Sequence, residues 1–403
     1  WSKGELFHGF VIISSALWGT VIGAIFGGIP TEKLGRKKTL IWIGALFLIS
    51  ALGSALSSDP WVFSLFRFLG GLGVGASTVA APTYIAEIAP AEKRGKLVAL
   101  YQFNIVFGIM VAYLSNFLLS GIETNAWRWM IGIEAVPALI FSLLVLGVPE
   151  SPRWLISRKK DDKTALEVLK VTLSDEHAKQ QIKIIKNHLG SSPKNENIYQ
   201  PKYRLPLKLA FLIAFFNQFS GINAFLYFAP RIFEIAGLGE ESALLSSVGI
   251  GVVNILFTYL GLSLIDKTGR RNLMYYGSIG YIISLSLVAV AFLQGWQGIS
   301  IPLFFFLFIA AHGIGQGTVI WVFISEVFPN HLRADGQAFG SSVHWVLAAA
   351  IPSMIPFLFS SIGASTVFFI FAGMMVLQLF FVWKMMPETK GISLEELQKK
   401  LVK

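Results

Sequence analysis

The 403-residue chain is 54% hydrophobic and only 14% charged, and it contains no Cys. Soluble globular proteins carry roughly 25% charged residues, so this chain has too few polar groups to cover a water-facing surface. The absence of Cys excludes disulfides, thiol catalysis and thiolate metal sites. The net charge of +10 raises the question of a nucleic-acid partner, which the distribution of the charges argues against.

Apolar runs long enough to cross a bilayer, about 20 residues each, recur along the whole chain. Because backbone groups in lipid must be paired within their own segment, each run is expected to be one helix. The predicted spans are 7–29, 39–57, 61–85, 97–120, 128–148, 207–233, 243–265, 273–293, 301–324, 337–360 and 364–386.

The connections between these spans alternate in charge. The positive-inside rule assigns the basic connections to the cytoplasm, which predicts a multi-pass plasma-membrane protein with Trp1 outside and Lys403 inside. The positive charge then faces anionic lipid headgroups, and no nucleic-acid partner is needed to explain it. Nearly all Lys and Arg residues fall in 32–38, 92–96, 150–208, 266–271, 333 and 384–403.

One long polar segment, 150–206, interrupts the apolar pattern. Helical periodicity between Asp162 and His188 predicts short amphipathic cytoplasmic helices, and 191–195 has the composition of a linker. The predicted domains are an N-terminal bundle at 1–148, an intracellular helical domain and linker at 149–206, a C-terminal bundle at 207–386 and a cytoplasmic tail at 387–403.

The two sides of this segment resemble each other. Residues 35–37 (Gly-Arg-Lys) recur as 269–271 (Gly-Arg-Arg), and the Glu…Pro…Arg pattern of 87–94 recurs at 326–333. Two motifs at nearly one offset indicate a duplicated unit, an organisation that is common in transporters. Since the second half has one more helix ahead of its motif, we expect two six-helix bundles with the first helix missing ahead of Trp1.

The repeated motifs also predict ion pairs at the cytoplasmic ends of the helices. Their Arg side chains can pair with the acids of neighbouring helices, and such pairs can open and close during a conformational cycle. The alternative is generic positive-inside charge. The residues of this predicted ionic latch are Arg36, Glu87, Arg94, Arg270, Glu326 and Arg333.

Arg67 and Glu134 lie inside apolar spans of the first bundle. Ionisable residues there are costly and usually functional, and a buried charge needs a partner, so the two are predicted to pair. The functional hypothesis is a proton relay or conformational switch, and the alternative is a purely structural ion pair.

Amide side chains cluster in the 207–233 span at Asn217 and Gln218. They must face protein or a cavity, and their donors and acceptors suit sugar hydroxyls; the alternative is hydrogen bonding between helices. Polar or aromatic residues at midspan elsewhere could complete a site for a neutral sugar, although each alone has a structural explanation. These residues are Gln102, Asn254, Trp321, His344 and Trp345.

No catalytic constellation stands out, so we expect neither an enzyme nor a metal or cofactor site. The glycine run 70–75 lies in an apolar span and indicates close helix packing rather than nucleotide binding. Without an ATP site, transport would run downhill or on an ion gradient.

Motifs across the whole length of the chain resemble those of the sugar porter family of the major facilitator superfamily. They are Arg67–Gly71, Pro149–Leu155, Gln218–Asn223, Asp266–Arg271 and Pro387–Gly391. The resemblance implies an all-α membrane fold of two helix bundles with short intracellular helices, and a monosaccharide site between the bundles.

The resemblance also implies individual roles. Tyr227 matches the family's extracellular gate. His344 stands where Gln or Asn is usual, and Thr318 replaces a usual Pro, which leaves the bending of its helix open. The positions that match the family's sugar-binding residues are Gln102, Asn217, Gln218, Asn223, Asn254, Trp321 and Trp345.

The sequence is similar in style to bacterial members, so we favour proton symport over facilitated uniport. In proton-coupled members an Asp on the first helix pairs with the Arg that matches Arg67. The expected partners are a sugar, H⁺ and membrane lipid, for a protein that acts as a monomer. An organic-ion porter of the same superfamily and a non-transporting sugar sensor are the alternatives.

Overall fold

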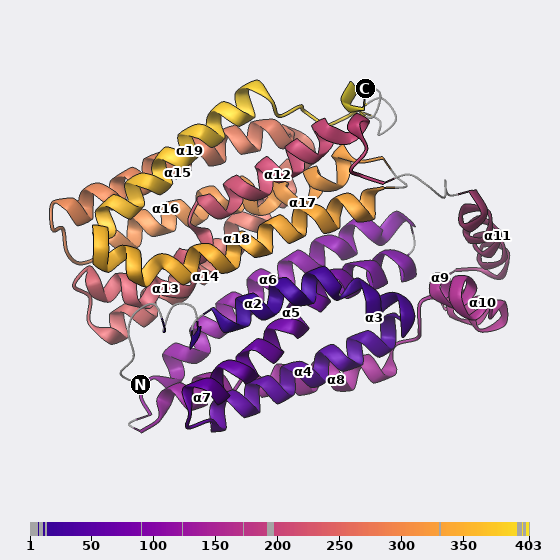
Figure 1. Ribbon diagram of the computed structural model, residues 1–403, viewed down its shortest axis with the longest axis horizontal. Helices are drawn as coiled ribbons and strands as arrows, with labels where there is room; N and C mark the ends of the chain where they lie inside the picture. Colours follow the sequence, from indigo (N-terminus) through magenta and orange to yellow (C-terminus); the bar gives the residue numbers. More distant parts are fainter. Residues whose placement is uncertain are drawn as a thin grey trace. The chain divides into compact units, whose positions relative to one another are not determined.

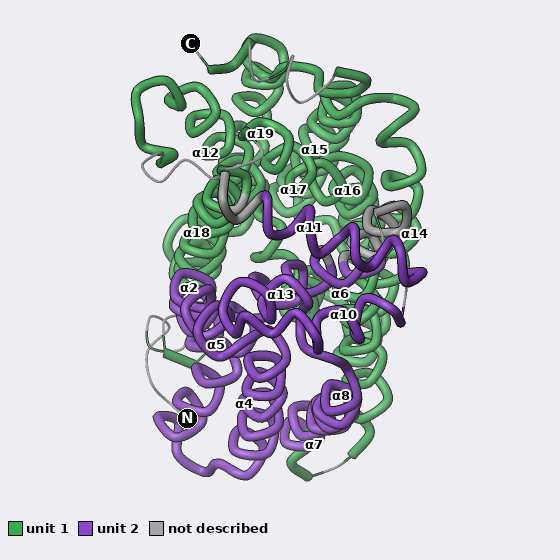
Figure 2. The backbone as a smooth tube through the Cα atoms, turned by 90° about the vertical axis from the view of Figure 1, so that its right-hand side faces the viewer, with its two compact units in different colours: residues 1–14, 103–126, 197–403 green, residues 15–102, 127–196 purple. Residues whose placement is uncertain are grey.

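The computed structural model describes residues 7, 11–12, 14–89, 91–122, 124–171, 173–191, 197–329, 332–392, 397 and 400–402. These residues form helices and the turns between them, with no strand among them. They divide into two compact units (Figure 2). Unit 1 contains residues 1–14, 103–126 and 197–403, and unit 2 contains 15–102 and 127–196.

Unit 2 contains the apolar helices of the first half of the chain, followed by the helices of the polar segment 150–206 (Figure 1). Its helices are α2 (Ser15–Phe26), α3 (Gly28–Lys33), α4 (Arg36–Leu56), α5 (Pro60–Ile88), the start of α6 (Ala91–Leu119), α7 (Ala126–Gly132), α8 (Ala135–Gly147), α9 (Pro152–Trp154), the π-helical turn Leu155–Lys159, α10 (Asp162–Lys170) and α11 (Asp175–Ser191).

Unit 1 takes the rest of α6 and all helices after the linker. They are a 3₁₀ turn (Pro201–Tyr203), α12 (Arg204–Phe219), α13 (Ile222–Ile235), α14 (Glu240–Thr268), α15 (Arg270–Leu293), α16 (Ser300–Ile314), α17 (Gln316–Val327), α18 (Arg333–Ile362) and α19 (Ala364–Lys384).

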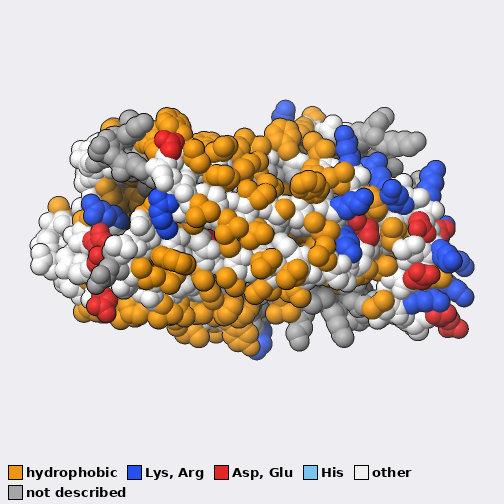
Figure 3. All heavy atoms as spheres, turned by 90° about the horizontal axis from the view of Figure 1, so that it is seen from below, with side chains coloured by type: hydrophobic (Ala, Val, Ile, Leu, Met, Phe, Trp, Pro, Cys, Tyr) orange, Lys and Arg blue, Asp and Glu red, His pale blue; other side chains and the backbone are white. Residues whose placement is uncertain are grey.

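Nine of the eleven predicted membrane spans are confirmed by length and composition. Within the described residues, nine helical segments are long and apolar enough to cross a membrane, and Ser15–Phe26 and Phe103–Leu119 are shorter apolar helices. Hydrophobic side chains cover the middle of the face in Figure 3, and Lys and Arg gather at the end that carries α9–α11. Apolar side chains are exposed in the middle of this face because lipid, not water, is their solvent.

Among the spans that we expected to be continuous helices, three contain a break with an identifiable cause. Gly221 (φ +83°) adopts the left-handed conformation and separates α12 from α13. Gly315 (φ −90°, ψ −102°) leaves the helical region between α16 and α17. Between α7 and α8 the cause is Pro137, which has no N–H to continue the ladder.

The open question about Thr318 is thereby answered. The helix breaks at Gly315 without a Pro at position 318. The Thr318 hydroxyl donates to the Gly313 carbonyl at 2.6 Å, which pairs a backbone acceptor at the break.

Glycines allow α2 and α5 to pack backbone against backbone. A Cβ on Gly71 would lie 1.9 Å from the Ala16 carbonyl oxygen, and a Cβ on Gly75 would lie 2.2 Å from that of Thr20. No side chain fits at such distances. The prediction that 70–75 is a helix-packing motif is therefore confirmed.

The predicted amphipathic helices of the polar segment are confirmed as α10 and α11. They pack on the start of the segment through a small core of Trp154, Leu155, Ile156 and Ala165. Most of the predicted linker 191–195 lies outside the described residues.

The units differ from the predicted domains, chiefly because 103–126 groups with unit 1 rather than with the other N-terminal helices. The Tyr113 hydroxyl of α6 donates to the Leu226 carbonyl of α13, and Gly251 approaches Met110 closely. The four-part division given above stays a prediction.

Gly71→Ala should lower the stability of unit 2, because the added methyl must displace a backbone carbonyl of α2. Overpacking of this kind costs about 1–3 kcal/mol. Thermal unfolding in detergent measures this loss of stability. Gly147→Ala is the control, since a Cβ there meets no atom of the described residues within 4 Å. Equal melting temperatures for the two variants would contradict the close contact.

Candidate functional site

The break between α12 and α13 gathers polar side chains inside unit 1. Ser220 pairs backbone groups on both sides of this break. Its hydroxyl donates to the Asn217 carbonyl at 2.6 Å and accepts from the backbone N–H of Ile222 at 3.3 Å. Backbone groups freed by Gly221 thus find partners locally, as a break within a membrane requires.

Three predicted site amides meet at this break. Gln218 Nε2 donates to Asn217 Oδ1 at 2.8 Å, and Asn223 Nδ2 donates to Gln218 Oε1 at 2.8 Å. Asn217 is 2% exposed and Gln218 is 1% exposed. We call these three residues the amide cluster.

Aromatic rings of α17 and α18 adjoin the amide cluster. Gln218 Nε2 lies 3.0 Å from His344 Nδ1. The His344 ring lies 4.9 Å from that of Trp321 and 5.0 Å from that of Trp345, centroid to centroid. The Trp345 Nε1 is buried and has no hydrogen-bond partner among the described residues. The predicted combination of amides with Trp rings is therefore present within one unit.

The remaining predicted binding residues stand apart from this cluster or cannot be placed. Asn254 is buried on α14, where its Oδ1 accepts from the Thr258 hydroxyl at 3.3 Å; in the described part of the chain no hydrogen bond joins it to the cluster. Tyr227, 47% exposed, follows Asn223 by one turn of α13. The side chain of Gln102 lies outside the described residues.

The predicted ion pair between Arg36 and Glu87 is present in unit 2. It is bidentate, with both N···O distances 2.8 Å, and the side chains are 12% and 8% exposed. The Ser151 hydroxyl donates to the same carboxylate at 2.5 Å. Glu150 accepts from the backbone N–H groups of Arg36 and Lys37 at 2.9 and 3.1 Å, where the N-terminus of α4 favours an anion.

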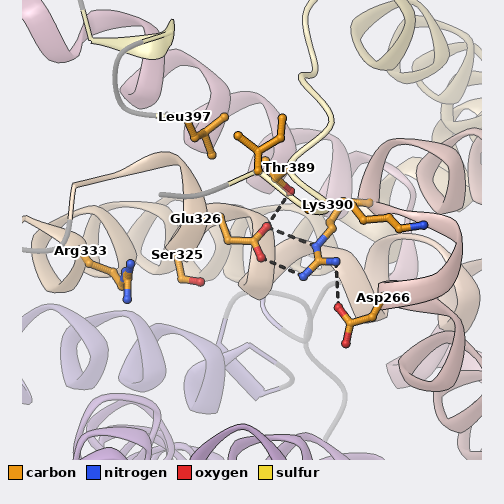
Figure 4. Close-up of a pocket in the computed structure, with 10 residues that line it drawn as sticks. Asp266, Ser325, Glu326, Arg333, Thr389, Lys390 and Leu397 are labelled. Atoms are coloured by element: carbon orange, nitrogen blue, oxygen red, sulfur yellow. Dashed lines mark hydrogen bonds and ion pairs between the residues drawn. The ribbon is translucent and has the colours of Figure 1, made fainter. Parts of the chain in front are cut away.

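Unit 1 repeats this arrangement with different residues. Arg270 contacts Glu326 through Nε and Nη2 at 3.3 and 2.9 Å, and the Thr389 hydroxyl donates to Glu326 at 2.6 Å (Figure 4). Glu388 accepts from the backbone N–H groups of Arg270 and Arg271, both at 3.0 Å. We call the two arrangements the ionic clusters.

Each ionic cluster needs the glycine that precedes its Arg. Gly35 (φ +102°) and Gly269 (φ +93°) hold a backbone conformation that other residues rarely adopt. A Cβ on Gly35 would lie 2.3 Å from Glu150, and one on Gly269 would lie 2.5 Å from Glu388. The carboxylates sit where the missing side chains would be.

Sequence reasoning missed the acids and hydroxyls that complete these clusters. They belong to 149–151 (Pro-Glu-Ser) and 387–389 (Pro-Glu-Thr), which we used only as family motifs. The two tripeptides repeat at nearly the offset of the Gly-Arg and Glu…Arg motifs. Treating them as a third member of the internal repeat would have found them.

The unit 1 cluster borders a pocket of about 570 Å³. Arg333 and Lys390 also line it, together with Asp266, which accepts from Arg270 Nη1 at 2.9 Å (Figure 4). Burial lowers the pKa of the Arg333 guanidinium, and the carboxylate of Glu326 acts in the opposite direction. The Glu326 carboxylate thus interacts electrostatically with both of its predicted basic partners, Arg270 and Arg333.

The corresponding partner in unit 2 is Arg94. Its side chain lies outside the described residues, so its predicted contact with Glu87 stays a prediction.

Arg67 and Glu134 pair as predicted, within unit 2. Arg67 Nη1 lies 3.2 Å from Glu134 Oε2, with the side chains 29% and 53% exposed. Glu134 stands at the break between α7 and α8, so the acid of this pair lies where the helix is already interrupted.

No group of three or more His, Asp or Glu side chains suited to a metal ion occurs among the described residues. The arrangement can instead bind neutral polar groups at the amide cluster and make or break ion pairs at the helix ends. Together with the membrane spans, this defines a membrane transport protein.

The chain belongs to the sugar (and other) transporter family, whose model matches residues 8–401. It is 37% identical to the arabinose-proton symporter of Bacillus subtilis, over 98% of this chain and 86% of that protein. It is 34% identical to the D-xylose-proton symporter of Escherichia coli, over 96% of this chain and 84% of that protein.

A solved structure agrees with this assignment. The chain matches the inward open conformation of the E. coli xylose transporter XylE with a TM-score of 0.86 and 32% identity, over 99% of this chain and 90% of that chain. The predicted major facilitator fold and family resemblance are confirmed.

Glu326→Ala should destabilise unit 1, because it leaves the Arg270 guanidinium, 11% exposed, without its bidentate partner. Loss of such a charged hydrogen-bonding partner costs about 1–3 kcal/mol. Unfolding in increasing denaturant measures the cost. The control is Glu234→Ala, since Arg231 in that ion pair is 71% exposed. If both variants lose the same stability, the ionic cluster contributes no more than a surface pair.

Proposed function

We propose that this protein moves a monosaccharide, a hexose or pentose, across the membrane together with H⁺ by alternating access. The observation that supports this most directly is the amide cluster beside the rings of His344 and Trp321. The proposal agrees with relatives that are named for arabinose, xylose and glucose transport.

The chemistry of the cluster suits a neutral polyol. Each sugar hydroxyl both donates and accepts, and each amide offers both functions. An indole ring covers the apolar C–H face of a pyranose. None of the clustered side chains carries a carboxylate or ammonium group, which disfavours an organic ion as the substrate. Further proposed contacts are Gln102, Asn254 and Trp345, with Tyr227 as the gate.

The ionic clusters supply the proposed conformational latch. Arg36–Glu87 and Arg270–Glu326 join separate helices, and Arg94 and Arg333 are the further basic members of the latch. By the positive-inside rule these helix ends face the cytoplasm, with Trp1 outside and Lys403 inside. We expect the transporter to work as a lipid-embedded monomer without an enzymatic step.

Arg67 and Glu134 are the proposed coupling pair. A carboxylate that pairs with Arg in one state and takes up a proton in another links proton movement to the conformational change. The exposure of Glu134 and its position at a helix break make its carboxyl reachable.

Proteoliposomes that contain the protein should take up labelled arabinose, xylose, glucose, galactose or fructose. Gln218→Ala should raise the half-saturating concentration about 5- to 150-fold, because the sugar and two amides lose hydrogen bonds worth about 1–3 kcal/mol. Gln294→Ala, in an exposed loop, is the control. Specific sugar binding without flux would indicate a sensor, and no binding or uptake of any of these sugars would refute the proposal.

A pH gradient that is acidic on the side from which the sugar enters should accelerate sugar uptake and drive accumulation of the sugar inside the proteoliposomes. Glu134→Gln should abolish accumulation while equilibrium exchange of sugar continues, because the neutral amide cannot carry the proton. Uptake by the unmodified protein that ignores the gradient would indicate a uniporter. Gradient-driven accumulation by Glu134→Gln would leave Arg67–Glu134 a structural pair.

A further inference from the structure

A row of hydrogen bonds leaves the amide cluster and runs into the interior of unit 1. Asn217 Nδ2 donates to Gln316 Oε1 at 3.4 Å. Gln316 Nε2 donates to Gln378 Oε1 at 2.8 Å, and Gln378 Nε2 donates to the Ser278 hydroxyl at 2.8 Å. None of the last three residues has a role in the binding chemistry described so far.

The row ends on a backbone carbonyl. The Ser278 hydroxyl donates to the Met274 carbonyl oxygen at 2.7 Å. A carbonyl oxygen only accepts, and a hydroxyl has one hydrogen. Ser278 therefore uses its hydrogen on Met274 and must accept from Gln378, so the NH₂ group of Gln378 has to face Ser278.

The hydrogen bond from Ser278 to the Met274 carbonyl is the anchor of the row, and it fixes the orientation of every amide before it. An amide has donors at one end and acceptors at the other, so the oxygen of Gln378 faces Gln316, which must donate. The same reasoning applies to Asn217, which must donate to Gln316, and then to the other residues of the amide cluster. All the bonds point one way, in the order Asn223, Gln218, Asn217, Gln316, Gln378, Ser278 and the Met274 carbonyl.

Burial makes this orientation stringent. Gln316, Gln378 and Ser278 are each 0% exposed. A reversed amide at such a position would set oxygen against oxygen or nitrogen against nitrogen, and no water would replace the lost bond.

The row also joins broken helices to continuous ones. Gln316 is the first residue of α17, directly after the break at Gly315, and Asn217 lies in the last turn of α12 before the break at Gly221. Ser278 lies on α15 and Gln378 on α19, both uninterrupted. The continuous helices thus hold the side chains at the two breaks.

We propose that Gln316, Gln378 and Ser278 are positioning residues that set which atoms of the amide cluster face the substrate as donors and which as acceptors. The proposal rests on the sugar-binding role of that cluster. Asn223 begins the row and donates its Nδ2 to Gln218, so its Oδ1 is directed to accept from a ligand. One substrate hydroxyl must then donate, which a fluorine in its place cannot do.

The test compares binding of D-glucose and D-xylose with binding of their monodeoxyfluoro derivatives. Ser278→Ala removes the anchor, so the ratio of affinities between parent sugar and the most disfavoured fluoro derivative should fall at least about fivefold. Ser284→Ala is the matched control. Ser284 is equally buried on the same helix, and within the described residues its hydroxyl donates only to the backbone carbonyls of Gly280 and Tyr281. The affinity ratio of Ser284→Ala should change less than about twofold.

Gln378 provides a rescue that a merely structural role would not produce. Gln378→Met should reduce the ratio as Ser278→Ala does. In Gln378→Glu the buried carboxyl stays protonated, so it donates to Ser278, accepts from Gln316 and keeps the ratio of the unmodified protein. Unchanged ratios in both Ser278→Ala and Gln378→Met would overturn the proposal, as would equal effects of Met and Glu at position 378.

A measurement without sugar separates this proposal from the proposed function. Hydrogen exchange of residues 215–224 in lipid nanodiscs should accelerate in Gln378→Met and not in Gln294→Met, because only the first releases Asn217 from α19. Absence of sugar binding by the unmodified protein counts against the proposed function, whereas unchanged exchange in Gln378→Met counts against the positioning row.

Discussion

The structure depends on the requirement that a polar group inside a membrane-spanning bundle finds its hydrogen-bond partner within the protein. Continuous helices meet this requirement by themselves, but this chain interrupts its helices at Gly221 and Gly315. Ser220 and Thr318 supply local partners there. Because the breaks attract polar side chains, they are also where binding chemistry can be placed.

The same requirement operates at helix N-termini. The backbone N–H groups that open α4 and α15 have no partner in their own helices, and Glu150 and Glu388 accept from them. The two halves of the internal repeat therefore share more than charge. Each has a glycine, an Arg–Glu pair, a second acid and a hydroxyl. Opening such a cluster would expose several groups at once, as the proposed latch requires.

Some of the site could be predicted because its signals are local or repeated. Arg67 and Glu134 stand out as ionisable residues in apolar spans, and the Arg36–Glu87 pairing follows from the duplicated motifs. Gln316, Gln378 and Ser278 carry no such signal. They belong to none of the motifs or repeats identified in the sequence, and their sequence positions are far apart. Only folding brings α15, α17 and α19 together and turns them into one hydrogen-bonded row.

The sequence by itself determined nine of the membrane spans, the basic connections, the close helix packing at 70–75 and the family, because hydropathy, charge and glycine spacing act over short stretches. The tertiary structure decided where the helices break, which acids complete the ionic clusters and which way the site amides point. These depend on where distant backbone groups and side chains meet, and a buried amide takes its orientation from partners that its own sequence neighbourhood does not contain.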